Sequence, residues 1–273
     1  MRLSEATRLL SDAGIDSPRE NARKLFSHFV GIPQYRMIAE DPETENEALI
    51  DAIRRRADRE PLQYIIGEVD FFREVYKVSP DCLIPRSDTE VLVEYAVRNI
   101  PDGALILDLC TGSGCVAIST LNNTNGTSAV AVDISAGALE IAKRNATFNK
   151  VGERVRFLQL DVLTEELMPG VMFDAILSNP PYVSDSAYAS LEPEIFREPS
   201  IAFVGGDDGA DFYRHITSKY KGRLKPGGFI AYEIGYDQSE LISLIAKTNG
   251  MTVEIIRDIS QNPRVAVLRP ETK

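Results

Sequence analysis

The tetrapeptide Asn179-Pro180-Pro181-Tyr182 combines residue types that suit the binding of a flat amino group. Asn179 supplies a side-chain carbonyl acceptor and an amide donor. The two prolines stiffen the chain and remove two backbone donors, which leaves carbonyl groups free to face a ligand. Tyr182 offers a ring on which a planar group can pack. A Pro-Pro turn can also simply end a strand, so the interpretation depends on the neighbouring motifs.

The chemistry that this motif favours is transfer of a carbon to a planar nitrogen. Such a nitrogen is a poor nucleophile because its lone pair is delocalised. If Asn179 and the Pro180 carbonyl accept both N–H hydrogens, the nitrogen gains electron density and its lone pair is aimed at the electrophile. Alignment of this kind contributes up to about 7–11 kcal/mol in ideal cases. We predict that Asn179 and Pro180 are catalytic, with Pro181 and Tyr182 completing the substrate site.

A second candidate site is the turn Cys110-Thr111-Gly112-Ser113-Gly114, which follows an apolar stretch and leads into a predicted helix. Its glycines can adopt positive φ and let a ligand approach the backbone. Asp133 ends the next predicted strand about 20 residues further on, where an acidic side chain accepts hydrogen bonds from ribose hydroxyls. This pattern predicts a nucleoside-containing cofactor, but alone it does not distinguish a dinucleotide from S-adenosylmethionine.

Strands that alternate with helices are expected to position both turns. A helix is predicted over 136–148, and the turn Pro226-Gly227-Gly228 is expected to introduce a late strand. The predicted strands are residues 104–109, 129–132, 155–159, 173–178, 229–234, 253–257 and 265–268. This alternation predicts an α/β fold with a doubly wound, mostly parallel seven-stranded sheet of the Rossmann-like kind. No helix separates the last two strands, so the last one is expected to pair antiparallel.

The segment before the sheet predicts helices and then a hairpin. Residues 17–20 and 44–47 each read as a capping box that opens a helix, with Pro18 at the first helical position and Gly31 at a helix end. Residues 70–78 have the composition of a hairpin or extended linker. We therefore expect three parts, namely a helical bundle (1–66), a hairpin linker (67–85) and an α/β domain (86–273).

Charge, cysteine usage and apolar stretches indicate what kind of partner the protein binds and where in the cell it works. The net charge is −11, which favours a protein partner over bare nucleic acid, because binding to phosphates needs a basic face. Cys82, Cys110 and Cys115 have no metal-site spacing, so we expect reduced, mostly buried thiols and no metal centre. No apolar stretch approaches the roughly 20 residues of a membrane span, and the N-terminus lacks the apolar core of a signal peptide. We expect a cytoplasmic protein that acts as a monomer.

Over nearly its whole length the chain resembles the peptide chain release factor N5-glutamine methyltransferases of the HemK/PrmC group. Asn-Pro-Pro-Tyr alone is shared with adenine methyltransferases. Its combination with the motif Ile-Pro-Arg-x-Asp-Thr-Glu at residues 84–90 and with a helical N-terminal domain is much more specific. The matching motifs are Pro61 to Gly67, Leu83 to Glu90, Asn179 to Tyr182, Glu198-Pro199 with Gly205 to Gly209, and Leu224 to Gly235.

The resemblance implies a class I methyltransferase fold and methylation of the glutamine in the Gly-Gly-Gln loop of class I release factors, in support of translation termination. It assigns Asn179 and Pro180 to the glutamine amide and the helical domain to the release factor. It assigns Cys110, Thr111, Gly112, Ser113, Gly114, Asp133 and Asn179 to S-adenosylmethionine, with Asp161 or Val162 bordering the adenine.

Two positions depart from the family pattern. Cys110 stands where the family usually has glycine, and we expect its small side chain to be tolerated if φ is negative there. Ser87 replaces the usual proline, which we expect to be harmless because serine is a good N-cap. Two alternatives stay open. One is an adenine-N6 methyltransferase that acts on a flipped base of DNA or RNA, and the other is a non-catalytic nucleotide-binding or scaffold protein.

Overall fold

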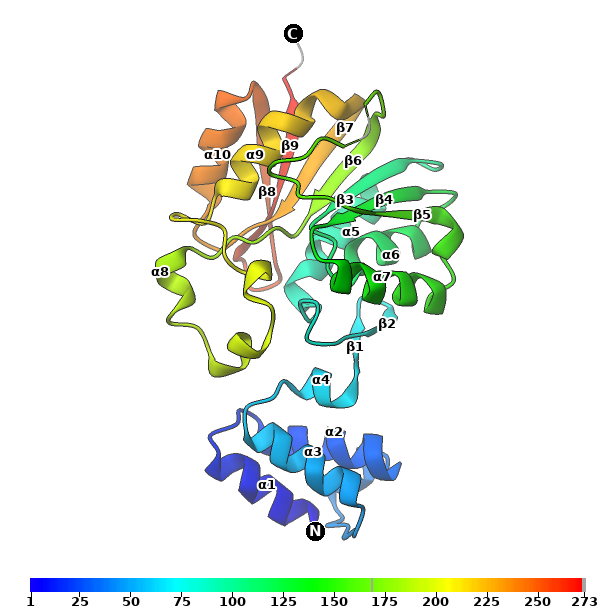
Figure 1. Cartoon of the computed structure of the whole chain (residues 1–273), viewed down its shortest axis with the longest axis vertical. Coiled ribbons are helices and arrows are strands. Elements are labelled where there is room, and N and C mark those ends of the chain that lie inside the picture. Colours follow the sequence, from blue (N-terminus) through cyan, green and yellow to red (C-terminus); the bar gives the residue numbers. More distant parts are fainter. Residues whose placement is uncertain (168, 272–273) are drawn as a thin grey trace. The chain divides into compact units, whose positions relative to one another are not determined.

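The computed structural model describes residues 1–167 and 169–271. The chain divides into two compact units (Figure 1). Each unit has its own apolar core. One unit comprises Met1–Glu68 and Glu192–Arg197, and the other comprises Val69–Leu191 and Glu198–Lys273. Among the described residues, no helix has both the length and the apolar character needed to span a bilayer.

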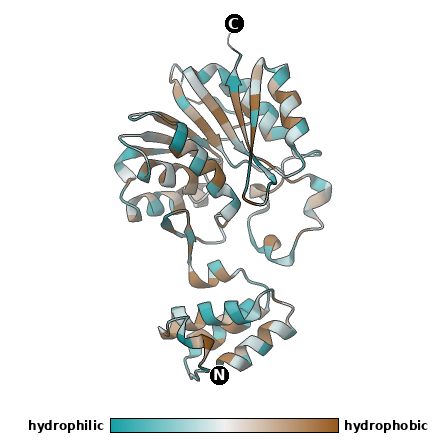
Figure 2. Ribbon diagram, turned by 180° about the vertical axis from the view of Figure 1, so that it is seen from behind, coloured by the Kyte–Doolittle hydropathy of each residue, from teal (hydrophilic) through white to brown (hydrophobic). Residues whose placement is uncertain are grey.

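The first unit is the helical bundle that the sequence predicts. Its amphipathic helices turn their apolar sides inward onto a core that includes Leu10, Leu25, Phe26, Leu49 and Ile53. Figure 2 shows both hydrophilic and hydrophobic residues along these helices. The elements are α1 (Leu3–Asp12), α2 (Pro18–Val30), the 3₁₀ turn η1 (Arg36–Ile38), α3 (Glu47–Ala57) and α4 (Leu62–Ile66).

The ends of these helices agree with the sequence only in part. Pro18 is the first residue of α2, and Gly31 follows its last turn with a φ of 76°, as predicted. The predicted capping box at Ser17 is wrong: Ser17 has a φ of 49°, and its side chain caps nothing. A side-chain cap needs extended backbone at that position. For α3, Asn46 rather than Thr44 is the cap, because Asn46 Oδ1 accepts from the N–H of Leu49 at 3.0 Å.

Residues 192–197 belong to this helical unit although they are far from it in sequence. Glu194 Oε1 pairs with Arg56 Nη2 at 3.1 Å and with Arg59 Nη1 at 3.3 Å. Arg197 donates to Asp58 at 2.9 Å. The Arg56 side chain is 9% exposed, so its pairing with Glu194 is largely shielded from water. Nothing in the local sequence pattern predicts this segment as part of the bundle.

Within the described residues, the second unit is built on a seven-stranded sheet with the strand order β5-β4-β3-β6-β7-β9-β8. All pairings from β5 to β7 are parallel, whereas β9 runs antiparallel to both β7 and β8. This order confirms the doubly wound fold and the antiparallel last strand. The strands are β3 (Leu105–Leu109), β4 (Ser128–Asp133), β5 (Val155–Gln159), β6 (Phe173–Ser178), β7 (Leu224–Glu233), β8 (Met251–Arg257) and β9 (Pro263–Pro270).

Strand β7 begins earlier than predicted. Pro226-Gly227-Gly228 lies inside the strand instead of forming a turn before it. The pairing register with β6 shifts between Phe173 and Ala175, next to this segment. Proline and glycine are tolerated in a strand at such an irregularity, because the ladder is locally interrupted there. The turn signal in the sequence therefore marks a bulge.

Helices cover both faces of the sheet, and each layer has its own apolar cluster. On one face, α5 (Glu90–Asn99), α6 (Cys115–Asn122) and α7 (Ala136–Phe148) pack through residues such as Leu92 and Ile118. On the other, α9 (Asp211–Tyr220) and α10 (Ser239–Thr248) pack through residues such as Ile216 and Ile242 (Figure 1). The remaining short helical elements are η2 (Ser87–Thr89), η3 (Gly152–Arg154), α8 (Asp185–Tyr188), η4 (Pro193–Arg197), η5 (Ser200–Ala202) and η6 (Lys221–Arg223).

The start of α5 differs from the N-cap expected at Ser87. Ser87 is the first residue of the 3₁₀ turn η2, and no side chain caps that turn. The expected capping role of Ser87 is therefore wrong. The extra turn places the next residues so that Thr89 is buried at the start of α5, where it takes part in the site described below.

The predicted hairpin is confirmed as β1 (Glu68–Phe71) and β2 (Glu74–Lys77), which form a two-stranded sheet. The Tyr76 hydroxyl lies 2.6 Å from Ser119 Oγ of α6, and Asn145 of α7 donates from Nδ2 to the Lys77 carbonyl at 3.0 Å. The second strand is therefore fixed to two helices of the α/β unit, and the chain that follows it, towards residue 85, enters the site from a defined point.

Candidate active site

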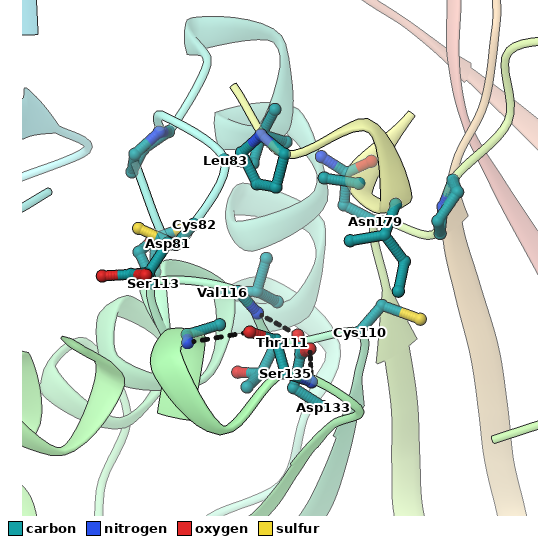
Figure 3. Close-up of a pocket in the computed structure, with 18 of the residues that line it drawn as sticks. Asp81, Cys82, Leu83, Cys110, Thr111, Ser113, Val116, Asp133, Ser135 and Asn179 are labelled. Atoms are coloured by element: carbon teal, nitrogen blue, oxygen red, sulfur yellow. Dashed lines mark hydrogen bonds between the residues drawn. The ribbon is translucent and has the colours of Figure 1, made fainter. Parts of the chain in front are cut away.

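A cavity lies at the carboxyl ends of β3, β4 and β6, where ligands of open α/β sheets bind. The space between its walls amounts to about 680 Å³ when the open solvent at its mouth is included. Figure 3 shows Asn179 and Leu83 across the cavity from Asp133. The lining includes Asp81, Cys82, Leu83, Pro85, Arg86, Thr89, Cys110, Thr111, Gly112, Ser113, Val116, Asp133, Ile134, Ser135, Ala138, Asn179, Pro181, Pro199 and Ile201.

The structure brings most of the predicted site residues together around this cavity. From the Asn-Pro-Pro-Tyr bend, Asn179 and Pro181 line the cavity, whereas Pro180 and Tyr182 do not. The predicted cofactor residues that line it are Cys110, Thr111, Gly112, Ser113, Asp133 and Asn179. Gly114, Asp161 and Val162 lie outside the lining formed by the described residues, so their contact with a cofactor stays a prediction.

The two glycines of the turn after β3 both have positive φ, 55° at Gly112 and 83° at Gly114, as the sequence predicts. Their tasks differ. A Cβ on Gly112 would meet nothing within 4 Å, whereas a Cβ on Gly114 would lie 3.2 Å from the Cβ of Ala142 in α7 and 2.8 Å from Ile118 Cδ1. Gly114 therefore permits close packing of α6 and α7, while Gly112 borders the cavity.

Cys110 has a φ of 59°, so the condition on which its tolerance was expected, a negative φ, is not met. The left-handed region costs a residue with a Cβ on the order of 1–3 kcal/mol. The surrounding structure must hold Cys110 in place: the residue packs against the apolar cluster under α9 and α10. Burial also raises the pKa of its thiol well above the usual value, so the thiol is protonated and unreactive near neutral pH.

Asp108 lies fully buried beneath the turn. Its Oδ2 accepts from Thr111 Oγ1 at 2.5 Å and from the N–H of Ala117 at 3.2 Å, which fixes the turn against the first residues of α6. Burial raises the pKa of this carboxyl to about 7, more than its two hydrogen bonds lower it. Its Oδ1 has no partner among the described residues. This carboxyl positions the turn from below and does not line the cavity.

Asp133, at the end of β4, is held by backbone groups on both sides. Its Oδ2 accepts from the N–H of Gly112 at 2.8 Å, and its Oδ1 accepts from the N–H of Ser135 at 2.9 Å (Figure 3). Burial raises the pKa of this carboxyl. Each carboxylate oxygen keeps a second acceptor direction, so Asp133 can still bind a diol at the cavity. This geometry supports the ribose role that the sequence predicts.

The bend after β6 is anchored at its first residues. Ser178 Oγ donates to the Leu109 carbonyl at 2.7 Å, which joins the ends of the two neighbouring strands. Asn179 Nδ2 donates to Thr89 Oγ1 at 3.1 Å. Because one edge of the Asn179 amide is engaged in this way, its Oδ1 is the edge left for a ligand. Pro180 and Pro181 are buried, which fits a bend with little freedom.

The later part of the bend contacts two other segments. The Tyr182 hydroxyl donates to Glu233 Oε1 at 3.1 Å, so its phenol points to β7. Residues Gly205 to Gly209 pack backbone against backbone on the bend. A Cβ on Gly205 would lie 2.6 Å from the Pro181 carbonyl oxygen, and one on Gly209 would lie 2.2 Å from the Tyr182 carbonyl oxygen. Glycine is required at both positions because the backbone of the bend lies too close for a Cβ. The sequence alone does not reveal this reason.

Sequence reasoning missed one wall of the cavity. Cys82, Leu83 and Pro85 line it, and Glu198 holds this segment by accepting from the N–H of Ile84 at 3.0 Å and from Arg86. The carboxylate of Glu198 is almost completely buried, with a side chain that is 2% exposed. The two motifs that contain Ile84 and Glu198 were visible in the sequence, but their separation hid the fact that one supports the other.

Comparison with protein families agrees with this architecture. A family model described as the PrmC N-terminal domain matches residues 2–67. A second model, described as the methyltransferase small domain, matches residues 87–201, which contain the glycine turn, Asp133 and the Asn-Pro-Pro-Tyr bend. The solved structure of a ribosomal protein L11 methylase from Lactobacillus delbrueckii subsp. bulgaricus has a TM-score of 0.54, at 17% identity and with 73% of this chain and 87% of that chain covered. At that identity the likeness shows the fold alone.

Curated relatives cover nearly the whole chain. A release factor glutamine methyltransferase from Caulobacter vibrioides is 35% identical over 267 residues, which are 94% of this chain and 91% of the relative. One from Moorella thermoacetica is 37% identical over 254 residues, with 91% and 89% covered. Matches that cover more than nine-tenths of the chain extend over both units. The chain therefore belongs to the release factor glutamine methyltransferase family.

Proposed function

We propose that this protein transfers the methyl group of S-adenosylmethionine to the side-chain amide nitrogen (N5) of the glutamine in the Gly-Gly-Gln loop of class I release factors, and so supports translation termination. The observation that carries the proposal is the position of Asn179. Its amide borders the same cavity as Asp133 and the turn at Gly112, with Nδ2 engaged by Thr89. The part of the Asn179 amide that is left for a ligand is thus an acceptor for an N–H group, in a residue that lines the same cavity as Asp133.

The residues around the cavity fit S-adenosylmethionine. Asp133 offers carboxylate oxygens to the ribose hydroxyls, and the apolar side chains of Leu83, Ile134 and Ala138 suit a largely apolar nucleoside. The turn at Thr111 to Ser113 precedes the N-terminus of α6, whose free N–H groups favour a carboxylate. The bound cofactor supplies an electrophilic methyl group on a sulfonium.

The substrate amide is held by acceptors. Asn179 Oδ1 accepts one of its N–H hydrogens and the Pro180 carbonyl accepts the other, which turns the nitrogen lone pair towards the methyl group. As the bond between the nitrogen and the methyl carbon forms, the carbon–sulfur bond of the sulfonium breaks, and the methylated nitrogen then releases one proton to solvent. No strong base is needed before attack, because that proton becomes acidic only after methylation. Burial of Pro180 and Pro181 keeps the bend rigid, so the alignment is established before the substrate arrives. Exclusion of water by the bound substrate favours a reaction in which the sulfonium charge is lost.

The partner of this reaction is a protein loop, which agrees with a net charge of −11. In the proposed complex, the helical unit contacts the release factor away from the reacting glutamine. The enzyme acts as a monomer in the cytoplasm, where release factors work, and it needs no nucleic acid, membrane or metal. Light scattering of the enzyme alone and mixed with a release factor measures both the monomer and the complex.

The decisive experiment is incubation of the protein with a purified class I release factor and isotope-labelled S-adenosylmethionine, followed by mass spectrometry of the peptide that contains Gly-Gly-Gln. We expect one methyl group on the glutamine. A release factor whose loop glutamine is replaced by glutamate should take up no label, because its side chain carries no amide. Label in DNA or RNA with none in the release factor would decide for the adenine methyltransferase. Cofactor binding without any turnover would decide for a non-catalytic protein.

A further inference from the structure

Glu233, the last residue of β7, is a buried carboxylate with two hydroxyl partners next to the candidate site. It is 2% exposed. Thr89 Oγ1 donates to its Oε2 at 2.5 Å, and the Tyr182 hydroxyl donates to its Oε1 at 3.1 Å. Glu233 itself does not line the cavity, whereas Thr89 does. The carboxylate therefore meets the site only through other residues.

Thr89 connects this carboxylate with Asn179. The hydroxyl of Thr89 has a single hydrogen, which it gives to Glu233, and so its oxygen is an acceptor towards Asn179 Nδ2 at 3.1 Å. Rotating the Asn179 amide by half a turn would set its carbonyl oxygen against that acceptor. The polarity of the chain from Asn179 to Thr89 to Glu233 thus selects one of the two amide orientations, the one that leaves Oδ1 for the ligand.

We propose that Thr89 and Glu233 are positioning residues for the methyl transfer, because together they lock Asn179 with its carbonyl oxygen turned to the substrate amide. This inference rests on the proposed function for its chemistry. The orientation of Asn179, however, is a property of the protein alone and can be measured without a substrate. The Tyr182 hydroxyl donates to the other oxygen of the Glu233 carboxylate. Both ends of the bend are therefore connected to Glu233, Asn179 through Thr89 and Tyr182 directly.

The protonation state of Glu233 decides whether the network is ordered in this way. Burial raises the pKa of Glu233 to about 7, opposed by the hydrogen bonds from Thr89 and Tyr182 and by the charge of Arg264, and assisted by Asp88. From α9, the neutral Tyr213 donates to the main-chain carbonyl of Glu233 at 2.9 Å. An ionised Glu233 accepts from both hydroxyls, whereas a protonated one has a hydrogen of its own to place against one of them.

A matched pair of variants tests the role of Thr89. Thr89→Val keeps the shape but removes the hydroxyl, and Thr89→Ser keeps the hydroxyl. We expect kcat on the release factor to fall about 10- to 100-fold in Thr89→Val, because a poorly held Asn179 loses part of the roughly 100- to 1,000-fold that one well-placed polar group contributes. In Thr89→Ser, kcat should stay within about threefold of the parent. Equal kcat in the two variants would overturn the proposal.

A pH profile tests the role of Glu233. In the parent, kcat should rise as pH increases through about 7, because ionisation of Glu233 orders the network. In Glu233→Gln the rise should be absent and kcat should stay low. A rise near that pH of the same size in Glu233→Gln would show that another group is responsible, and would overturn the role. Thermal melting shows whether Glu233→Gln folds. If it does not fold, the comparison of Thr89→Val with Thr89→Ser tests the positioning role instead.

A readout without substrate separates this inference from the proposed function. In ¹⁵N-labelled protein with bound S-adenosylmethionine, the side-chain NH₂ of Asn179 should exchange slowly with solvent in the parent and in Thr89→Ser, and at least tenfold faster in Thr89→Val. Equal exchange in all three would overturn the positioning role. If the parent leaves release factor unmethylated while this exchange pattern holds, then the proposed substrate is wrong and the network stands.

Discussion

Gln238 donates from Nε2 to the main-chain carbonyl of Tyr182 at 3.0 Å, while its Oε1 accepts from the N–H of Gly235 at 2.9 Å. A single side chain thereby joins the end of the Asn-Pro-Pro-Tyr bend to the turn that follows β7. The bend is consequently fixed at both ends, by Ser178 and Asn179 at its start and by Gln238 at its finish. A rigid bend is what the proposed chemistry requires, because alignment of the substrate amide must exist before the reaction begins.

Replacing Asn179 should separate catalysis from cofactor binding. In Asn179→Ala we expect methyl incorporation into the release factor to fall at least about 100-fold, because the lost acceptor contacts the reacting amide. Affinity for S-adenosylmethionine should change much less, within about tenfold, as calorimetry can show. Turnover equal to that of the parent would exclude Asn179 from the reaction.

Replacing Asp133 should act on the cofactor instead. We expect Asp133→Ala to weaken the binding of S-adenosylmethionine by roughly tenfold or more, since charge-assisted hydrogen bonds contribute about 1.5–3 kcal/mol each. Asp102→Ala is a matched control, because that aspartate is exposed and is not part of the cavity lining. Unchanged affinity in Asp133→Ala, measured by calorimetry, would remove this residue from the cofactor site.

Glu198 should matter for stability through the segment that it holds. Glu198→Ala leaves the buried N–H of Ile84 without its acceptor and Arg86 without its carboxylate. We expect the free energy of unfolding to fall by about 1–3 kcal/mol, measured in a denaturant titration. Glu198→Gln retains an acceptor for Ile84 and should lose less. If alanine and glutamine cost the same, the contact with Ile84 contributes little.

Asp108 predicts a pH dependence of stability. Burial raises its pKa from 3.8 to about 7, so the folded state binds its proton more tightly than the unfolded state does. The resulting stabilisation is present at low pH and is lost as pH rises through about 7. Asp108→Asn cannot ionise. Its melting temperature relative to that of the parent should therefore increase as pH rises from about 4 to about 7, the range between the unfolded and folded pKa of Asp108. A difference that stays constant would mean that Asp108 titrates normally.

The sequence predicted the elements that repeat regular physical patterns. Helix α7 and strands β5 and β6 have the predicted bounds, because apolar periodicity decides such elements. The glycine turn and Asp133 meet at one cavity, since the carboxyl ends of parallel strands lie at one edge of a sheet. Local motifs and fold class together therefore located the cavity and seven of the residues that line it, whereas the roles of these residues stay a prediction.

What the sequence could not predict depends on contacts between distant residues or on backbone angles that it does not encode. Serine has the chemistry of an N-cap, but Ser17 adopts left-handed backbone and its side chain leaves the helix end uncapped. Cys110 adopts a left-handed φ of 59° although it carries a Cβ. The support that Glu198 gives to Ile84 spans 114 residues, and no periodicity carries information over that distance.

The membership of residues 192–197 in the helical unit bears on how this enzyme can be divided. A chain that starts at residue 69 would keep Glu194 and Arg197 but lose Arg56, Arg59 and Asp58, the residues that neutralise them. The helical unit therefore cannot be removed as one continuous segment, because it is made of two stretches of the chain that are far apart in sequence. Exchanging it between relatives, in evolution or by engineering, means changing both stretches at once.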